Sequence, residues 1–291
     1  MKKYIPYLVI AVVAVAIIFG INRPIDHEDD APLNPSSESF LPSDDSITIS
    51  KSNNTHVSIY MENSGSMDGY VNLNSEFKDA LGKIIVKSNS FFPDTHLYFV
   101  NNEIYDVDNT ALKGNVNNFV AQLNSATMKI GNTKNTNINQ IFKLVLDKTN
   151  KDTVSILFSD FVYSIGGKNV STEISNAKNA TMGAFMDALK KDKNFATIIL
   201  KCQSKFQGTY FDRNDHGQHY NGVRPYYVFI MGSYDRLKEV NERLELNNSA
   251  VTGIPGLKEK YFLSTKTWTL NEETVQVITT DYTNTDMIKA D

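Results

Sequence analysis

The fold is decided by the stretch VSIYMENSGSMDG, residues 57–69. It begins with the apolar, β-branched residues Val57 and Ile59 and leads directly into Glu62-x-Ser64-x-Ser66. Such apolar runs are typical of parallel strands that are buried on both faces. Polar side chains just past the carboxyl end of such a strand stand where open α/β sheets bind ligands. A carboxylate and two hydroxyls offer only hard oxygen ligands, which suit Mg²⁺ or Mn²⁺ better than zinc or copper.

Two later segments complete the set of oxygen ligands. Thr136 places a hydroxyl at the start of the helical pattern of residues 136–142, and the apolar strand pattern of residues 154–160 ends on Asp160. The ends of strands that are far apart in the sequence can converge at one edge of a parallel sheet. We therefore expect these oxygens to lie together.

These segments resemble the metal-ion-dependent adhesion site of von Willebrand factor type A domains over roughly residues 54–246. The pattern of that family is Asp-x-Ser-x-Ser, then a Thr in a Thr-Asn-Ile-like turn, then a strand that ends in Asp. This chain has Glu62 where the family usually has Asp, and Phe161 follows Asp160 where the family often has Gly.

The resemblance implies a role for each residue of the site. Ser64 and Ser66 would be direct ligands of Mg²⁺ or Mn²⁺, and Thr136 would be the third hydroxyl. Glu62 and Asp160 would supply negative charge and hold ordered waters. One position of the ion would stay open for an Asp or Glu side chain of a partner protein, so the resemblance implies a binding module and not an enzyme.

Composition limits the other classes of function. The chain has 291 residues, of which 41% are hydrophobic, enough for one large domain or two small ones. The net charge is −4 and no basic cluster follows Lys2-Lys3, so we do not expect nucleic acid binding. The single cysteine, Cys202, excludes an internal disulfide and a cysteine-based zinc site, and we expect it to be a buried thiol.

The first residues predict a compartment. Lys2-Lys3 precede an uncharged apolar run from Tyr4 to Ile21, whose length is close to the roughly 20 residues that cross a bilayer. By the positive-inside rule, a single-pass anchor at 1–21 would leave the rest of the chain outside the cytoplasm. In a bacterium this is the periplasmic face of the inner membrane. A cleaved signal sequence is the alternative. Residues 22–54 are rich in Pro, Ser and acidic residues, which predicts a flexible linker.

Strand and helix patterns alternate after the linker. We predict helices around 77–85, 116–123, 138–145, 182–189 and 237–244, and strands around 57–61, 97–100, 104–107, 154–158, 196–200 and 226–231. This order favours a three-layer α/β/α domain at 55–256 with a doubly wound, mostly parallel sheet, as in von Willebrand factor type A and Rossmann-like folds. Asn101-Asn102 predicts the turn of an antiparallel edge hairpin. We predict an extended hairpin or a flap at 201–225, and a small β-rich extension at 257–291 that contains a further hairpin.

Other arrangements stay open as alternatives. Asp68 and Asp160 could act as paired carboxylates of a Mg²⁺-dependent hydrolase, although no phosphate-binding Gly-rich loop or Lys/Arg stands beside them. The two serines lack the flanking glycines of a nucleophile elbow, which disfavours a serine hydrolase. His216-x-x-His219, with Asp212 and Asp215, could bind a transition metal, although these residues lie in a Gly/Asn/Asp-rich segment that is typical of a solvated loop. A third alternative is a structural interaction module whose metal site is degenerate.

Overall fold

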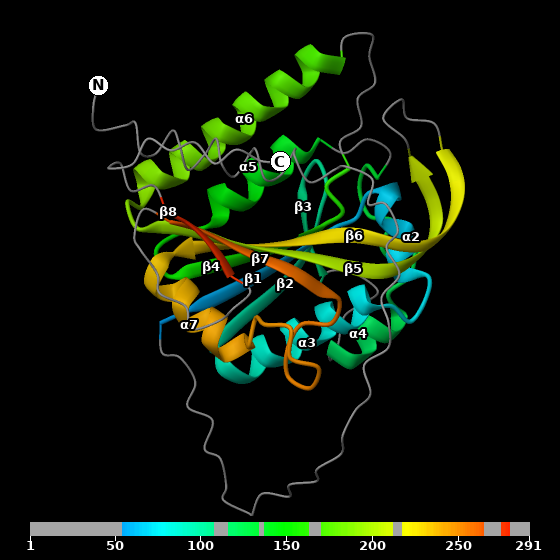
Figure 1. Cartoon of the computed structure of the whole chain (residues 1–291), viewed down its shortest axis with the longest axis horizontal. Coiled ribbons are helices and arrows are strands. Elements are labelled where there is room, and N and C mark those ends of the chain that lie inside the picture. Colours follow the sequence, from blue (N-terminus) through cyan, green and yellow to red (C-terminus); the bar gives the residue numbers. More distant parts are fainter. Residues whose placement is uncertain are drawn as a thin grey trace, which may run out of the picture.

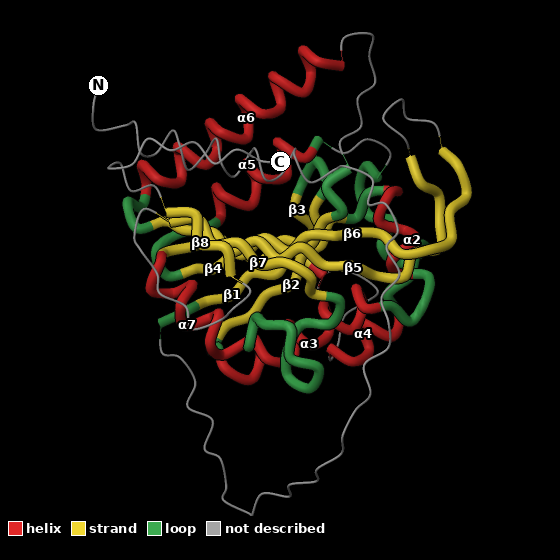
Figure 2. Tube along the Cα trace, in the orientation of Figure 1, coloured by secondary structure: helices red, strands yellow, loops and turns green. Residues whose placement is uncertain are grey.

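The computed structural model describes residues 54–107, 116–133, 137–162, 170–211, 217–264 and 275–279. One eight-stranded sheet runs through these residues and has helices on both of its faces (Figures 1 and 2). The prediction of an α/β fold is confirmed. The predicted anchor at 1–21 and the linker at 22–54, apart from its last residue, lie outside the described residues. Within the described ranges, no helix has the length and apolar character that spanning a membrane requires.

The elements follow the predicted alternation closely. The strands are β1 (His56–Glu62), β2 (Asp94–Val100), β3 (Ile104–Asp106), β4 (Thr153–Ser159), β5 (Phe195–Phe211), β6 (Gly217–Ser233), β7 (Leu257–Ser264) and β8 (Val275–Thr279). The helices are α2 (Asp68–Val71), α3 (Glu76–Phe91), α4 (Val116–Gln122), α5 (Ile138–Lys148), α6 (Val170–Lys191) and α7 (Tyr234–Leu244), and a 3₁₀ turn, η1 (Gly65–Met67), precedes α2.

The strand order in the sheet is β3-β2-β1-β4-β6-β5-β7-β8. Strand β1 is parallel to both β2 and β4, and β2 and β3 form the predicted antiparallel hairpin. Strand β6 lies between β4 and β5 and is antiparallel to both, and β7 is antiparallel to β5. The sheet is therefore more mixed than the mostly parallel sheet that we expected.

The core has two halves, one on each face of the sheet. On β1, Ile59 and Met61 belong to the cluster that packs with α3 and α7, whereas Tyr60 belongs to the cluster that packs with α5 and α6. All three side chains are at most 2% exposed, which confirms that β1 is buried on both faces. Local signals place the helices: the Ser75 hydroxyl caps α3 by accepting a hydrogen bond from the Lys78 backbone amide at 3.3 Å.

Strands β5 and β6 form a long hairpin that extends past the end of the sheet, at the right of Figure 1. Of the two predictions for residues 201–225, the extended hairpin is confirmed for the described residues. Strand β6 pairs with β4 only from Tyr227 to Met231, so its earlier residues continue beyond the carboxyl end of β4. This overhang brings residues of the hairpin to the edge of the sheet where the predicted site lies.

The β-rich C-terminal segment contributes to the same sheet. Strand β7 pairs with β5, and β8 pairs in parallel with β7. The sequence predicts a hairpin between residues 265–270 and the region of β8, and this pairing stays a prediction. Those residues lie outside the described ranges.

Helix α2 packs closely against β5 through two glycines. A methyl group on Gly208 would stand 2.8 Å from the Cα and 3.0 Å from the backbone nitrogen of Gly69, which is closer than real side chains come. Because these neighbours are backbone atoms, they cannot move aside cheaply. In contrast, a methyl group on Gly183 of α6 would meet no atom within 4 Å.

We predict opposite effects of alanine at these two glycines. Gly208→Ala should lower the free energy of unfolding by about 1–3 kcal/mol, as overpacking does. Gly183→Ala should raise it by about 0.5–1 kcal/mol, because alanine is the better helix former and has room here. Urea denaturation of both variants measures the difference. Equal stability of the two variants would contradict the close packing of α2 on β5.

Candidate metal centre

Glu62 ends β1, and its side chain is fully buried. The Ser64 hydroxyl donates a hydrogen bond to Glu62 Oε1 at 2.6 Å, and the Ser159 hydroxyl donates to Glu62 Oε2. A buried carboxylate is costly unless its oxygens accept hydrogen bonds. Ser159 is the last residue of β4, so Glu62 joins the carboxyl ends of two neighbouring parallel strands.

The contacts continue as a chain of oxygens. The Ser64 and Ser66 hydroxyls lie 2.9 Å apart, and the Ser66 hydroxyl donates to Asp160 Oδ1 at 3.1 Å. Four of the five predicted site residues, Glu62, Ser64, Ser66 and Asp160, are therefore in contact. None of them is more than 7% exposed.

The fifth predicted residue, Thr136, lies outside the described residues. The described segment before it is joined to the turn after β1, because the Gly65 amide donates to the Thr133 carbonyl at 3.0 Å. The side-chain amide of Asn63 also donates to the carbonyls of Met128 and Ile130, both at 2.8 Å. These bonds hold residues 128–133 against the turn that carries the two serines.

The turn after β4 has a left-handed residue. Phe161 has φ +60°, a conformation that residues other than glycine seldom adopt. This turn lets the Val162 amide donate to Asp160 Oδ1 at 3.1 Å, while the Phe161 amide donates to the Ser159 hydroxyl at 3.0 Å. The Phe161 ring is buried and lies against Phe142, with their centroids 5.5 Å apart, and against Phe229 at 5.0 Å. Packing of the ring thus holds a strained backbone in place.

Asp160 lies beside a cation that sequence reasoning missed. Arg224, on the overhanging part of β6, places Nη2 3.8 Å from Asp160 Oδ2, too far for a hydrogen bond. Burial raises the pKa of Asp160, while the nearby Arg224 and the bonds from Val162 and Ser66 act in the opposite direction. The sequence signal for Arg224 was slight, because it is one of two arginines in the polar and aromatic segment 201–225.

The oxygen atoms of these residues are donors that suit a hard divalent ion. The residues bring two carboxylates and two hydroxyls to one place, and one carboxylate oxygen, Asp160 Oδ2, is buried and has no hydrogen-bond partner within the described part of the chain. Both oxygens of Glu62 accept bonds from hydroxyls, so Glu62 fits a role in holding those hydroxyls rather than direct ligation. In the described part of the chain, no group of three or more His, Cys, Asp or Glu side chains could hold a metal.

The alternative histidine site falls mostly outside the described residues, since Asp212, Asp215 and His216 are not among them. His219 is exposed on β6. Asp68 is the first residue of α2, and burial raises its pKa while Lys129 lowers it. Cys202 is a free and fully buried thiol, as expected.

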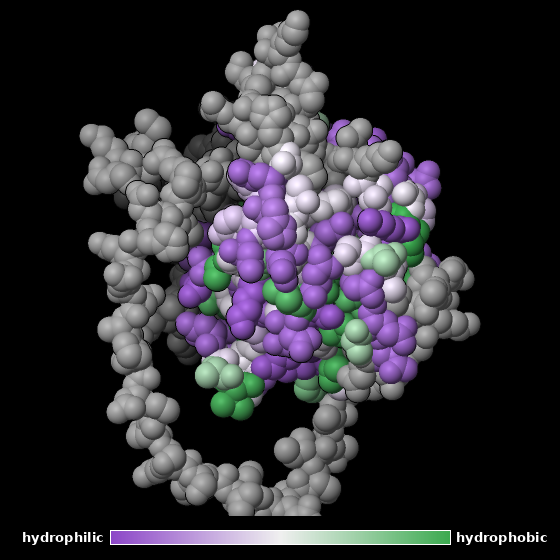
Figure 3. All heavy atoms as spheres, turned by 90° about the vertical axis from the view of Figure 1, so that its right-hand side faces the viewer, coloured by the Kyte–Doolittle hydropathy of each residue, from purple (hydrophilic) through white to green (hydrophobic). Residues whose placement is uncertain are grey.

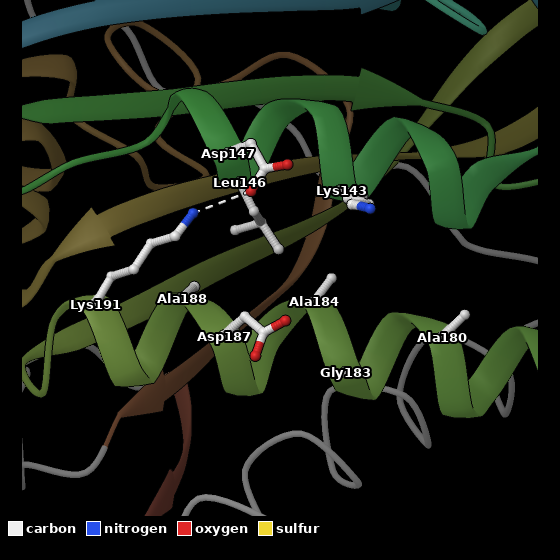
Figure 4. A pocket seen from close by; sticks show the side chains of 9 residues that line it. All are labelled: Lys143, Leu146, Asp147, Ala180, Gly183, Ala184, Asp187, Ala188 and Lys191. Carbon is white, nitrogen blue, oxygen red and sulfur yellow. Dashed lines mark hydrogen bonds and ion pairs between the residues drawn. The ribbon is translucent and has the colours of Figure 1, made fainter.

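A hollow of about 230 Å³ lies between α5 and α6 (Figure 4). Its lining combines small residues such as Ala180 and Gly183 with charged ones, and the Lys191 ammonium pairs with Asp147 at 3.0 Å. A second charged residue of the lining, Asp187, pairs with Lys190 at 2.7 Å. The strand-end cluster is the stronger candidate.

Comparison of the chain with protein-family models, with curated proteins and with solved structures finds no match. The candidate site therefore rests on the residues and their geometry.

We predict that the glycine variant at position 161 is more stable than the alanine variant, which is the reverse of the usual order in helices and strands. Both substitutions remove the buried ring, which should lower the free energy of unfolding by about 3–5 kcal/mol for Phe161→Ala. Phe161→Gly should be about 1 kcal/mol more stable than Phe161→Ala, because glycine tolerates the left-handed conformation. Thermal or urea denaturation of the two variants measures the ranking. If the alanine variant proved the more stable, this result would contradict the left-handed conformation of residue 161.

Proposed function

We propose that this chain is a binding module of the von Willebrand factor A type, which holds a partner protein through a divalent ion, Mg²⁺ or Mn²⁺. The observation that carries the proposal is the contact chain from Glu62 through Ser64 and Ser66 to Asp160 at the ends of β1 and β4. Thr136 is proposed as a further hydroxyl ligand. Hydroxyls and carboxylates at the ends of parallel strands are a donor set for a hard cation.

Charge supports a partner with an acidic side chain. Ser64 and Ser66 are neutral ligands, so an ion that they bind keeps excess positive charge. Because the four side chains are almost completely buried, electrostatic attraction at the site is weakly screened by water. A carboxylate from outside would then fill the remaining position of the ion.

The surface at this end of the sheet fits such a partner. The face at the right of Figure 1 is largely hydrophilic, with hydrophobic residues scattered among the polar ones (Figure 3). A partner would therefore dock there mainly through polar and charged contacts, with the ion as the anchor. We further propose that the N-terminal segment holds the module at the outer side of the membrane, which the sequence of residues 1–21 supports.

Titration of the full chain with Mg²⁺ and Mn²⁺ tests the proposal. We expect saturable binding by calorimetry, and a rise in the free energy of unfolding of about 2.7 kcal/mol when the metal is at 100 times its dissociation constant. Ser66→Ala and Asp160→Asn should abolish both effects, because each removes an oxygen of the set.

Ser88→Ala is the matched control. Ser88 is also a fully buried serine, on α3, but its hydroxyl makes no hydrogen bond. This variant should bind the metal as the wild type does. Absence of metal binding in the wild type would refute the proposal, and the contact between Asp160 and Arg224 would then be read as a structural ion pair in a degenerate site.

A further inference from the structure

Arg224 is held firmly in its position by aromatic rings. Its guanidinium carbon lies 4.6 Å from the centroid of the Phe206 ring and 4.8 Å from that of the Tyr210 ring, and both rings belong to β5. Tyr70 of α2 lies at 5.8 Å and donates its hydroxyl proton to the carbonyl of Pro225, the next residue on β6. Contacts of this kind orient a planar guanidinium.

Two buried atoms at this point have no hydrogen-bond partner among the residues that the structure describes. They are Nη1 of Arg224, a donor, and Oδ2 of Asp160, an acceptor. The two side chains form an ion pair in which the other guanidinium nitrogen, Nη2, lies 3.8 Å from Asp160 Oδ2. Arg224 as a whole is 8% exposed. Buried polar groups of natural proteins are nearly always satisfied, so each of these two groups points to something that binds beside it.

The chemistry of the two groups differs. Asp160 Oδ2 attracts a cation, whereas Arg224 Nη1 attracts an anion. A cation alone would satisfy the carboxylate but would be repelled by the guanidinium. An anion alone would satisfy the guanidinium but would be repelled by the carboxylate. Together, a divalent ion and a carboxylate satisfy both groups.

We infer that Arg224 is the second anchor for the acidic side chain of the partner, with one carboxylate oxygen bound to the ion and the other accepting a hydrogen bond from the guanidinium. This inference rests on the proposed metal-dependent function. It adds a specificity-determining residue from the β5–β6 hairpin, which does not belong to the predicted ligand set. Arginine suits this role because its donors form a rigid, planar fork.

The same geometry predicts a second property of Arg224. Its positive charge stands close to the proposed ion and repels it. Removal of the charge should therefore leave metal affinity unchanged or raise it, while it weakens the binding of a carboxylate. A residue with a merely structural role would not separate the two affinities in this way.

The experiment uses the full chain, Mn²⁺ and acetate as the simplest carboxylate probe. Bound Mn²⁺ is measured from the loss of the electron paramagnetic resonance signal of the free ion. Acetate binding is measured at equal Mn²⁺ occupancy from the paramagnetic relaxation of its methyl protons. Arg224→Met keeps a long apolar stem on the rings, and should bind Mn²⁺ at least as tightly as the wild type but acetate about tenfold more weakly.

Arg243→Met is the matched control, because Arg243 also lies over an aromatic ring, Phe91 at 5.8 Å, but stands on α7. It should change neither affinity. If Arg224→Met bound acetate as the wild type does, the role of Arg224 would be refuted while the metal site stood. If the wild type bound no Mn²⁺, the proposed function would fail and this inference with it.

Should Arg224→Met fail to fold, Arg224→Lys decides the question. Lysine keeps the charge but lacks the planar fork, so acetate should bind several-fold more weakly at the same Mn²⁺ occupancy. Unchanged acetate binding by this variant would overturn the inference.

Discussion

A buried carboxylate that has to be satisfied is the constraint on which this edge of the sheet depends. Glu62 is fully buried at the end of the central strand β1, and both of its oxygens accept hydroxyl hydrogen bonds. One donor, Ser64, belongs to the turn after β1, and the other, Ser159, belongs to the neighbouring strand β4. The need to satisfy one charge therefore fixes the turn after β1 against the end of β4, and Ser66 extends the contact to Asp160.

Much of this arrangement could be predicted because its signals are local. The apolar runs of β1 and β4 and the turn at Asn101-Asn102 all act over a few residues. Adjacent parallel strands end at the same edge of a sheet, so polar residues that follow two such strands come together without further information. This is why Glu62, Ser64, Ser66 and Asp160 could be assigned to one site from the sequence.

The place of β6 could not be predicted in the same way. Strand β6 lies between β4 and β5 because of strand pairing between residues that are far apart in the sequence. The mixed polar and aromatic residues of 217–225 show no pattern that indicates which strand they pair with. Arg224 reaches Asp160 only because β6 runs antiparallel to β4 and overhangs its end. The parallel pairing of β8 with β7 escaped prediction for the same reason, since the sequence pattern of a strand does not encode its direction.

Glu62 and Phe161 are the two positions at which the sequence differs from the pattern that it resembles, and the structure shows what each side chain does. The longer side chain of Glu62 reaches hydroxyls on both sides, so its charge is satisfied within the protein rather than by direct contact with an ion. Phe161 adopts a left-handed conformation that suits glycine better, and the contacts of its buried ring with Phe142 and Phe229 offset the strain.

Arg224 completes this balance of charge. Glu62 and Asp160 would be two buried negative charges close together, which is costly without a cation. The guanidinium of Arg224 offsets part of this negative charge whether or not an ion binds. The side chains of Glu62 and Asp160 can therefore keep their positions with and without an ion. In the proposed metal site, the positive charge of Arg224 would weaken the attraction for a divalent ion and would strengthen the attraction of the loaded site for a carboxylate. A site built in this way would favour affinity for its partner over affinity for its metal.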